Sequence, residues 1–343
     1  MLTPNVVPDF TALRVAVVGD MIVDHYIYAR PTRLSREAPV IVMRHAGEEI
    51  GAGGAANVAR NLWNLGAQTM LLGAVGQDKQ GRDVLRLLED EQVDVAEVEP
   101  VKGWQTPTKT RVLGAEPGRT MHQMLRIDRE PDAPMLQATR ETIAQRVRSL
   151  VGRVDALLVS DYGYGLVNDE VCSAAREVHE AGAVVVLDPR HDFDCLPGIT
   201  GMTPNLAELA VATGRDVNIF CDYSEVVSAA NELLARAQPT WLLVTMGNRG
   251  MALFSKEQTR GVTIRPAGSE SVIDVTGAGD TAAAAFTLSL AAGLSGPRAM
   301  RLANTAGGVV VREHGTAVCP LSTLRSELPH SPQPSVSSAP ALT

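Results

Sequence analysis

The segment Asp274–Asp280, with sequence Asp-Val-Thr-Gly-Ala-Gly-Asp, precedes an alanine-rich helical pattern. A glycine turn at a helix N-terminus leaves backbone amides without partners, and the helix dipole adds partial positive charge there. The amides of Gly277, Ala278 and Gly279 are therefore candidates for binding a phosphate group in transfer. Asp280 would repel a phosphate, so we expect it to accept a proton from a hydroxyl that attacks the phosphorus. The alternative is a plain glycine turn in which Asp280 caps the helix.

Three apolar runs that are typical of strands end in a carboxylate. They end at Asp20, Asp161 and Asp188, and Asp24 lies just beyond the first run. In open α/β sheets, ligands bind at the carboxyl ends of the strands. A single aspartate after a strand is usually a turn former or a helix cap. Three together favour a binding site.

Another group of polar residues follows the later predicted strands. Asn205 and Glu208 lie three positions apart at the start of a predicted helix, and residues 245–250, Thr-Met-Gly-Asn-Arg-Gly, follow a strand directly. Side chains three positions apart share one face of a helix. Asn205 and Glu208 are therefore candidates for orienting a hydrated Mg²⁺ or phosphate oxygens. The alternative role of Asn205 is to cap the helix.

The glycine-rich segment 51–57 raises a different function. Its sequence, Gly-Ala-Gly-Gly-Ala-Ala-Asn, matches the GxGxx(G/A) fingerprint of dinucleotide-binding oxidoreductases. However, residues 46–50 before it do not form a buried-strand pattern, and no acidic residue stands about 20 positions further on to bind a ribose. Close approach of the backbone to a sugar explains the glycines as well. An NAD-linked oxidoreductase and a catalytically silent nucleotide-binding regulator are the alternatives to a phosphate-transferring enzyme.

The elements that must position these residues alternate along the chain. Apolar runs predict strands, and periodic apolar positions between them predict helices. This alternation favours an α/β fold with a mostly parallel sheet and helices on both faces. Strands are expected at 14–19, 70–75, 156–160, 183–187 and 241–246, and helices at 55–65, 84–88, 136–151 and 282–292.

Two basic stretches, residues 26–50 and 102–129, interrupt the alternation. They are β-prone, lack a helical period and carry an excess of basic residues in an acidic chain. We expect them to form a small accessory sheet, whose cations either face solvent or another subunit, or bind an anion. Residues 1–12 are interpreted as an N-terminal extension, and residues 326–343, rich in serine and proline, as a disordered tail.

The composition excludes several classes of protein. The chain has 343 residues and a net charge of −8, the wrong sign for a protein that binds nucleic acid by neutralising phosphates. Its four cysteines are scattered without a CxxC pair, and its apolar stretches are too short to span a bilayer. We therefore expect a cytoplasmic protein with small-molecule ligands and with neither nucleic acid nor a membrane as partner.

Five motifs, in this order, resemble those of the PfkB or ribokinase-like family of carbohydrate kinases. They are GDMIVD (19–24), GGAAN (53–57), TPNLAE (203–208), TMGNRG (245–250) and DVTGAGD (274–280). The resemblance implies a ribokinase-like, Rossmann-type α/β sandwich over residues 13–325. The two basic stretches would form a small β-sheet lid, through which family members often dimerise.

The resemblance also implies ATP and Mg²⁺ as cofactors and a role for each site residue. Asp280 would be the catalytic base, and the amides of Gly277, Ala278 and Gly279 the anion hole. The nucleotide site would comprise Asn205, Glu208, Thr245, Gly247, Gly250 and Asn304, of which Asn205 and Glu208 would hold Mg²⁺ through water. The sugar would contact Asp24, Gly53, Gly54 and Asn57, with the strand-end Asp161 as a further candidate, and Asp274 would help to bind K⁺.

Within the family, the chain is most similar to the heptose-7-phosphate kinases. The similar segments are SREAPV (35–40), TKTRVL (108–113), LLVSDYGYG (157–165), LDPR (187–190) and the run 307–317. The expected reaction is phosphorylation of the anomeric hydroxyl of D-glycero-β-D-manno-heptose 7-phosphate, giving the 1,7-bisphosphate used for ADP-heptose and lipopolysaccharide core synthesis. The candidates for binding its distal phosphate are Lys109, Arg111 and Arg126. The alternative is a kinase of another sugar, sugar phosphate or nucleoside.

One region departs from the pattern of that subfamily. Residues 114–122 lengthen the connection that follows the TKTRVL segment. Because this region lies in the expected lid, the departure bears on the choice of sugar more than on catalysis.

Overall fold

The predicted apolar strands form one large sheet in the computed structural model, which describes residues 6–115, 121–268 and 272–336. In this part of the chain the sheet has ten strands in the order β14-β13-β12-β11-β10-β9-β8-β1-β4-β5. In this spatial order, neighbouring strands are parallel from β11 across the sheet to β5. Strands β12, β13 and β14 are added antiparallel at the other edge. The strands of the parallel part are β1 (Arg14–Gly19), β4 (Gln68–Gly76), β5 (Val98–Val101), β8 (Ala156–Ser160), β9 (Val184–Asp188), β10 (Gly201–Met202) and β11 (Trp241–Thr245). The antiparallel strands are β12 (Met251–Ser255), β13 (Gln258–Ile264) and β14 (Ser335–Val336).

Helices cover both faces of this sheet because its central strands are apolar on both faces. Val15 and Val17 of β1 lie in one hydrophobic core, while Ala16 and Val18 lie in the other. This is the pattern expected of a buried parallel strand. The helices of the first core are α1 (Ala55–Asn64), α2 (Lys79–Asp90), α7 (Ala278–Ala291), α8 (Gly296–Val310) and α9 (Leu321–Glu327). Those of the second are α3 (Gln137–Arg148), α4 (Asp169–Glu180), α5 (Leu206–Thr213) and α6 (Tyr223–Ala237).

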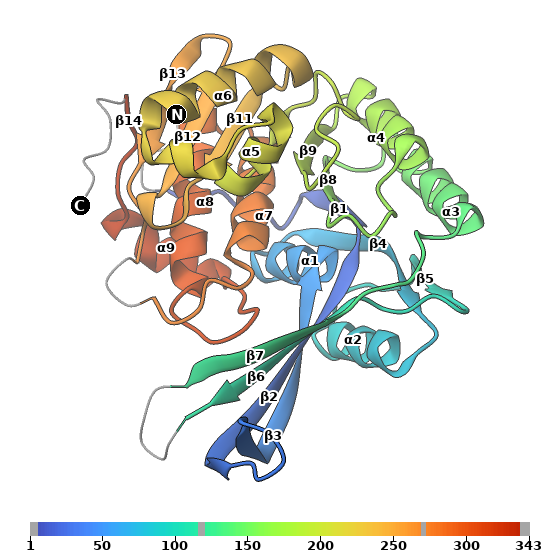
Figure 1. Ribbon diagram of the computed structural model, residues 1–343. Helices are drawn as coiled ribbons and strands as arrows, with labels where there is room; N and C mark the ends of the chain where they lie inside the picture. Colours follow the sequence, from blue (N-terminus) through green and yellow to red (C-terminus); the bar gives the residue numbers. More distant parts are fainter. Residues whose placement is uncertain (1–5, 116–120, 269–271, 337–343) are drawn as a thin grey trace.

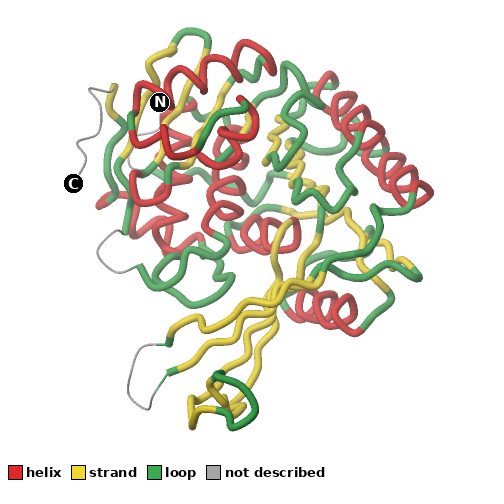
Figure 2. Tube along the Cα trace, viewed as in Figure 1, coloured by secondary structure: helices red, strands yellow, loops and turns green. Residues whose placement is uncertain are grey.

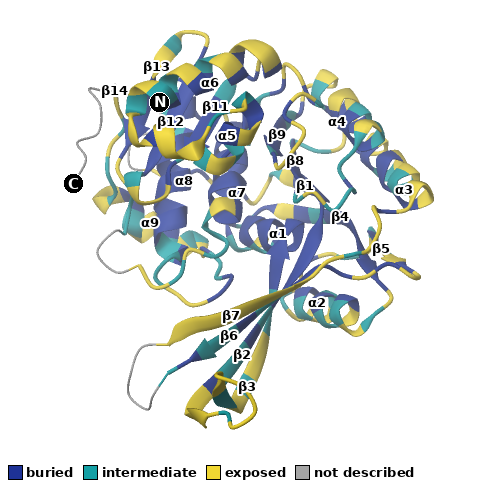
Figure 3. Cartoon of the chain, viewed as in Figure 1, coloured by how far each residue is buried: buried dark blue, intermediate teal, exposed yellow. Residues whose placement is uncertain are grey.

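A four-stranded sheet projects from this α/β body (Figures 1 and 2). Its strands, in the order β3-β2-β6-β7, are β2 (Met21–Leu34), β3 (Ile41–Gly54), β6 (Thr108–Gly114) and β7 (His122–Arg129). The expected accessory sheet is therefore confirmed, and we call these four strands the lid. Strands β2 and β3 are buried at the end next to the body and exposed at the far end, whereas β7 is exposed along its whole length (Figure 3).

The lid begins earlier in the chain than its β-prone stretches predict. Strand β2 starts at Met21, so Asp24 lies inside a strand and not in a loop beyond β1. The reason is long-range pairing: Asp24 pairs with Gly51 on one side and with Lys109 on the other. These partners are distant in the sequence, so the first residues of the strand carry no local signal.

The chain beyond Ser326 is more ordered than its composition predicts. Helix α9 continues to Glu327, a 3₁₀ turn covers Leu328–His330, and β14 pairs with β13. Leu328 is fully buried, and Arg301 donates a hydrogen bond to its carbonyl oxygen (2.7 Å). The prediction of a disordered tail is therefore wrong for residues 326–336, and residues 337–343 lie outside the described part.

The N-terminal extension also contacts the body. Of its residues, 6–12 are described, and Phe10 is buried in the first core. Across the described ranges, no helix is long and apolar enough to cross a membrane. All four cysteines are free thiols.

Candidate active site

Asp280 lies in the first turn of α7, three positions after the residue that caps the helix. That residue is Gly277, with a left-handed backbone (φ 78°). A β-carbon at Gly277 would lie 2.6 Å from the side-chain nitrogen of Asn57, so the turn needs glycine both for its conformation and for this close approach. The alternative in which Asp280 is the cap is therefore wrong, and its carboxylate is directed elsewhere.

The carboxylate of Asp280 is buried and accepts two hydrogen bonds. Asn57 donates to its Oδ2 (2.8 Å), and the hydroxyl of Tyr162 donates to its Oδ1 (2.6 Å). Burial raises the pKa of Asp280 to about 6, and the two hydrogen bonds act in the opposite direction. Asp280 is therefore mostly ionised at pH 7. Its pKa lies close enough to 7 for the carboxylate to take up a proton, as a general base must.

The glycine loop offers fewer amides than expected. The amide of Ala278 donates to the carbonyl of Val275 (3.2 Å), which closes the turn. Among the described residues, the amides of Gly277 and Gly279 have no acceptor. Of the three amides predicted for the anion hole, those of Gly277 and Gly279 are therefore free to donate to an anion, and that of Ala278 is not.

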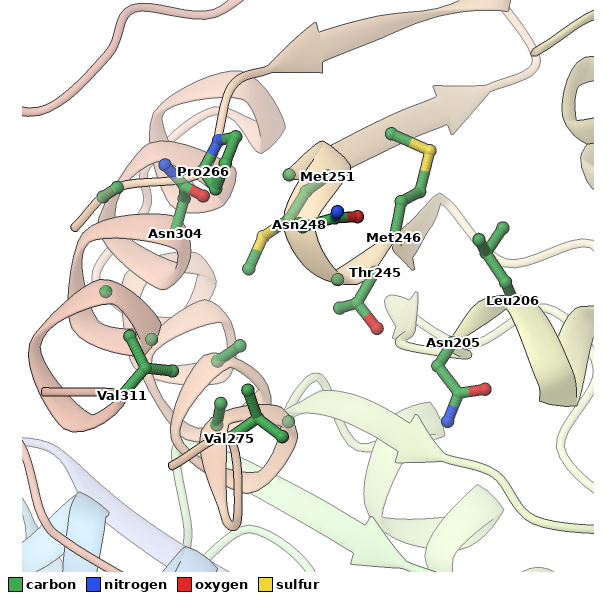
Figure 4. Close-up of a pocket in the computed structure, with 18 of the residues that line it drawn as sticks. Asn205, Leu206, Thr245, Met246, Asn248, Met251, Pro266, Val275, Asn304 and Val311 are labelled. Atoms are coloured by element: carbon green, nitrogen blue, oxygen red, sulfur yellow. The ribbon is translucent and has the colours of Figure 1, made fainter. Parts of the chain in front are cut away.

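A largely apolar pocket of about 640 Å³ opens beside the N-terminus of α7. Figure 4 shows Asn205 and Thr245 on one side of this pocket and Asn304 and Val311 on the other. The predicted nucleotide residues that line it are Asn205, Thr245, Gly247, Gly250 and Asn304. An apolar cavity of this size with a few polar groups suits a purine base and its ribose. We call it the nucleotide pocket.

A smaller pocket of about 150 Å³, the acid pocket, adjoins Asp280. Its walls carry four carboxylates, those of Asp161, Asp188, Glu208 and Asp280. Burial and the charge of Glu208 raise the pKa of Asp188 well above its usual range, and burial raises that of Glu208. Hard oxygen ligands that repel one another are chemically suited to Mg²⁺ and its water shell. Across the described residues, no group of three or more His, Cys, Asp or Glu side chains is placed to hold a metal ion.

Asn205 and Glu208 are already engaged with each other at the start of α5. Oδ1 of Asn205 accepts from the amide of Glu208 (2.9 Å), and Oε2 of Glu208 accepts from the amide of Asn205 (2.8 Å), which together form a capping box. Oε1 of Glu208 accepts from Arg190 (3.2 Å). The capping alternative for Asn205 is therefore correct. Its Nδ2 group donates no hydrogen bond among the described residues and is suited to a phosphate oxygen, while Oδ1 retains one lone pair.

A third pocket, of about 630 Å³, lies between the lid and the body and is lined by charged residues; we call it the charged pocket. Lys109 and Arg126 of the lid line it together with Tyr162 and Arg190 of the body, and so do the acidic residues Asp128, Glu130 and Asp132. Arg126 is held by both oxygens of Asp128 (2.6 and 2.7 Å). Within the described ranges Lys109 forms no ion pair, and its Nζ lies 5.1 Å from the centre of the Tyr162 ring.

The third candidate cation, Arg111, is neutralised inside the lid. It forms a buried ion pair with Asp24 and lies beside the ring of Tyr26 (5.4 Å). The sequence alone could not predict this ion pair, because the two residues are 87 positions apart. Lys109 is therefore the strongest of the three candidates for binding a phosphate, and Arg111 the weakest.

The glycines at 51–54 serve the junction between lid and body. A β-carbon at Gly53 would lie 2.3 Å from Oδ2 of Asp24, and Gly54 has a left-handed backbone (φ 59°) with its β-carbon position 2.4 Å from the carbonyl of Asp20. The segment belongs to lid strand β3 and the start of α1, and not to a strand of the parallel sheet. The structure therefore contradicts the dinucleotide-fingerprint interpretation.

Two of the strand-end carboxylates position loops. Asp161 accepts from the amides of Gly163 (2.8 Å), Arg190 (3.1 Å) and His191 (3.3 Å). Asp20 accepts from the amides of three residues in the loop after β8. Burial raises the pKa of Asp20 to about 6. Asp161 lines the acid pocket, yet its oxygens are largely committed to these amides.

Asp274 lies apart from the acid pocket in a turn of its own. It accepts from the amide and hydroxyl of Thr276 (2.9 and 2.7 Å) and from the amide of Gly315 (3.0 Å). A carboxylate in a cluster of backbone groups retains lone pairs for a monovalent cation. The assignment of K⁺ to Asp274 stays a prediction.

Tyr162 and Arg190 were not predicted as site residues, and Asp188 was predicted only as one of three strand-end carboxylates that favour a binding site. All three line the acid pocket. Asp188 ends strand β9, as its strand-end position predicted. Tyr162 is part of the SDYGYG segment, but its hydroxyl meets Asp280 only through a contact across 118 positions.

The apolar pocket and the acid pocket meet at the glycine loop before α7, and the acid pocket adjoins the charged pocket, an arrangement suited to phosphoryl transfer. The chain belongs to the PfkB family of carbohydrate kinases, whose family model matches residues 12–324. It is thus a sugar kinase with the ribokinase-like fold.

Curated relatives and solved structures agree with this assignment. The chain is 37% identical over 325 residues to the bifunctional protein HldE of Magnetococcus marinus, and 34% over 310 residues to that of Mesorhizobium japonicum. These matches cover 93% and 90% of this chain but 64% and 60% of the relatives, so the chain spans about three-fifths of their length.

Two solved structures share the fold at low sequence identity. One is phosphofructokinase-2 of Escherichia coli in complex with potassium, with a TM-score of 0.74 and 18% identity over 93% of this chain and 99% of the other. The other is ribokinase of Arabidopsis thaliana complexed with ribose and ATP, with a TM-score of 0.66 and 22% identity over 93% and 98%.

Proposed function

We propose that the protein transfers the γ-phosphoryl group of ATP to the anomeric hydroxyl of D-glycero-β-D-manno-heptose 7-phosphate. The observation that carries the proposal is the order of the three pockets. The acid pocket shares Asn205, Thr245 and Gly279 with the nucleotide pocket, and Tyr162 and Arg190 with the charged pocket. Asp280 thus lies between the nucleotide pocket, which would take ATP, and the charged pocket, where Lys109 would face the far end of a phosphorylated sugar.

The choice of heptose 7-phosphate has three supports. The segments quoted above resemble the heptose-7-phosphate kinases, and the curated relatives are bifunctional HldE proteins. The charged pocket adds a physical reason for a substrate that already carries a phosphate, because Lys109 brings a cation with no ion-pair partner among the described residues. The bisphosphate product suits the synthesis of a nucleotide-activated heptose.

In the proposed reaction, Asp280 takes the proton of the sugar hydroxyl as its oxygen attacks the γ-phosphorus. The amides of Gly277 and Gly279 stabilise negative charge on the equatorial oxygens. The Nδ2 group of Asn205 donates to a phosphate oxygen. Mg²⁺, held through water by Asp188 and Glu208, would neutralise charge on the nucleotide phosphates.

A substrate panel tests the proposed function. ADP formation is measured with Mg²⁺-ATP and, in turn, heptose 7-phosphate, fructose 6-phosphate, free heptose, ribose and adenosine. We expect turnover with heptose 7-phosphate at a kcat/KM at least about a hundredfold above that with free heptose, because an ion-paired phosphate contributes several kcal/mol. Turnover with only a free sugar or a nucleoside would support the kinase activity but contradict heptose 7-phosphate as the substrate.

Replacing Lys109 by methionine tests the proposed contact between this lysine and the phosphate of the sugar directly. The variant keeps an unbranched side chain over the Tyr162 ring and removes the charge. We expect the KM for the phosphorylated sugar to rise by about ten- to a hundredfold, with the KM for ATP unchanged. The control is Lys102→Met, an exposed lysine ahead of the lid strand β6. An unchanged KM in Lys109→Met would remove the assignment.

We also propose that two copies of the chain associate through the lid. All residues of the edge strand β7 are exposed, and they include the large apolar side chains of Leu125 and Ile127 (each 54% exposed). An exposed apolar edge strand is a surface for pairing with another chain.

The lid dimer has a simple test in the molar mass of the protein in solution. We expect the wild type to sediment as a dimer and the variant Leu125→Lys/Ile127→Lys as a monomer, since the charges would be buried in the interface. Val151→Lys, at another exposed apolar position, is the control and should remain dimeric. A wild type that is monomeric at tens of micromolar would contradict the proposal.

A further inference from the structure

Tyr162 touches both the catalytic carboxylate and the cation of the lid. Its hydroxyl donates to Oδ1 of Asp280 (2.6 Å), and the face of its ring lies under Nζ of Lys109 (5.1 Å to the ring centre). It lines the acid pocket and the charged pocket alike. One side chain therefore connects the part of the site that binds the far end of the sugar with the part that takes its proton.

The backbone under Tyr162 is held in place by a buried carboxylate. Asp20 accepts hydrogen bonds from the amides of Tyr162 (3.0 Å), Tyr164 (3.0 Å) and Leu166 (3.2 Å). Gly163 in this turn has a left-handed backbone (φ 79°). The turn is thus tied to the end of β1, and the hydroxyl of Tyr162 has a defined position relative to α7.

The two oxygens of Asp280 have different donors. Oδ2 accepts from Asn57 on α1, and Oδ1 accepts from Tyr162 on the loop after β8. A carboxylate held at both oxygens cannot rotate, so the lone pairs left for a sugar hydroxyl point in fixed directions. Fixing a reacting group in this way contributes to the rate through orientation.

We propose that Tyr162 is a positioning residue of the kinase, which acts on the reaction through Asp280 and links that base to Lys109 of the lid. The inference rests on the proposed role of Asp280 as the base. It assigns to the Tyr162 hydroxyl the task of keeping the carboxylate oriented and ionised, and to its ring the task of holding the lysine that faces the far end of the sugar.

The surroundings of Asp280 determine how its ionisation responds to the loss of the hydroxyl. The charged and titratable groups that face it are Asp24 on β2, Lys109 on β6, Asp161 and Tyr162 after β8, Asp188 and Arg190 at the end of β9, and Glu208 on α5. The carboxylates and burial favour the protonated form of Asp280, whereas Lys109 and the two hydrogen bonds favour the ionised form. Removing one hydrogen bond therefore moves the balance towards the protonated form.

The test is the variant Tyr162→Phe, which keeps the ring over which Lys109 lies and removes only the hydroxyl. In ADP formation with heptose 7-phosphate, we expect kcat at pH 8 to fall about tenfold, with KM for the sugar within about twofold of the wild type. We expect the acidic limb of kcat/KM, which lies near pH 6 in the wild type because the base must be ionised, to move up by about one pH unit.

The matched control is Tyr28→Phe. The hydroxyl of Tyr28 also donates to a carboxylate, that of Glu49 (2.9 Å), but in the lid and away from Asp280. Its loss should leave the acidic limb where it is. An equal shift in both variants would show a general effect of losing a hydroxyl and would overturn the inference.

A second readout needs no turnover. In protein labelled with ¹³C at the aspartate carboxyl carbons, the Asp280 resonance is the one lost in Asp280→Asn, and its titration should move upward in Tyr162→Phe, with circular dichroism confirming the fold. If neither the titration of the Asp280 resonance nor the acidic limb of kcat/KM moved in Tyr162→Phe, the proposed role of Tyr162 would be overturned and that of Asp280 would stand. An Asp280→Asn variant with wild-type activity would instead overturn the role of Asp280, so the two failures can be told apart.

Discussion

Replacing Asp280 by asparagine is expected to lower kcat by about a thousandfold, within the range of about 10² to 10⁴ that a positioned general base contributes. Asparagine has nearly the same shape but cannot take the proton of the attacking hydroxyl. The buried carboxylate is hydrogen-bonded by Asn57 and Tyr162, both away from the nucleotide pocket. The measurement is ADP formation at saturating ATP and sugar phosphate.

Two controls make this result specific. The affinity for ADP, measured by calorimetry, should remain within about threefold of the wild type, because Asp280 does not line the nucleotide pocket. Asp90→Asn, at an exposed carboxylate at the end of α2, should retain the wild-type kcat. If Asp280→Asn kept more than a tenth of the wild-type kcat, another group would have to be the base.

Loss of stability cannot explain the expected loss of rate. The pKa of Asp280 is raised from 3.8 to about 6 in the folded protein. A carboxyl whose pKa is raised by folding contributes stability that is present below 3.8 and is lost as the pH rises through 6. At pH 8 the ionised side chain therefore opposes folding, and we expect the melting temperature of Asp280→Asn to be no lower than that of the wild type.

The second large effect is expected from the ion pair between Asp24 and Arg111. Their side chains are 5% and 11% exposed, and the pair joins β2 to β6 at the base of the lid. Asp24→Ala would leave the guanidinium of Arg111 buried without its counter-charge. Removing one partner of a buried pair costs about 3 to 5 kcal/mol. We expect the free energy of unfolding in urea to fall by this amount.

The double variant Asp24→Ala/Arg111→Met distinguishes the net contribution of the ion pair from the cost of leaving one charge buried alone. Removing both charges also removes the desolvation cost, so the double variant should recover most of the lost stability. It should nevertheless remain impaired in sugar turnover if Asp24 contacts the sugar as the family resemblance implies. A single variant as stable as the wild type would mean that water or another group compensates Arg111.

Asp280 and Asp24 are expected to affect different properties of the protein. Asp280 is expected to affect the rate with little cost in stability, whereas Asp24 is expected to affect stability first. The lid is the reason for the second: its strands meet the body at Asp24, Gly53 and Gly54, where a β-carbon at either glycine would collide with a neighbour. This junction holds the lid against the active site.

The local features of the site were predictable from the sequence. A glycine turn before an alanine-rich segment predicts a helix N-terminus with free amides, and the structure places Gly277 and Gly279 there. Asn205 and Glu208 at three-residue spacing left open a shared helix face or a helix cap, and the structure has the cap, as a capping box. The apolar runs predicted the central strands, and the five motifs predicted the family. These features depend on neighbours within a few positions, so a sequence read locally contains them.

The tertiary structure alone decided which charges pair with which. Arg111 is paired with Asp24 while Lys109 has no ion pair among the described residues, and nothing in the spacing of these residues separates the two cations. The contact of Tyr162 with Asp280, the strand character of Asp24 and the order of residues 326–336 likewise depend on strand register and on packing between distant segments. A side chain's partner is set by the three-dimensional meeting of elements, because the free energy of a buried charge depends on what lies within a few ångströms and not on its place in the chain.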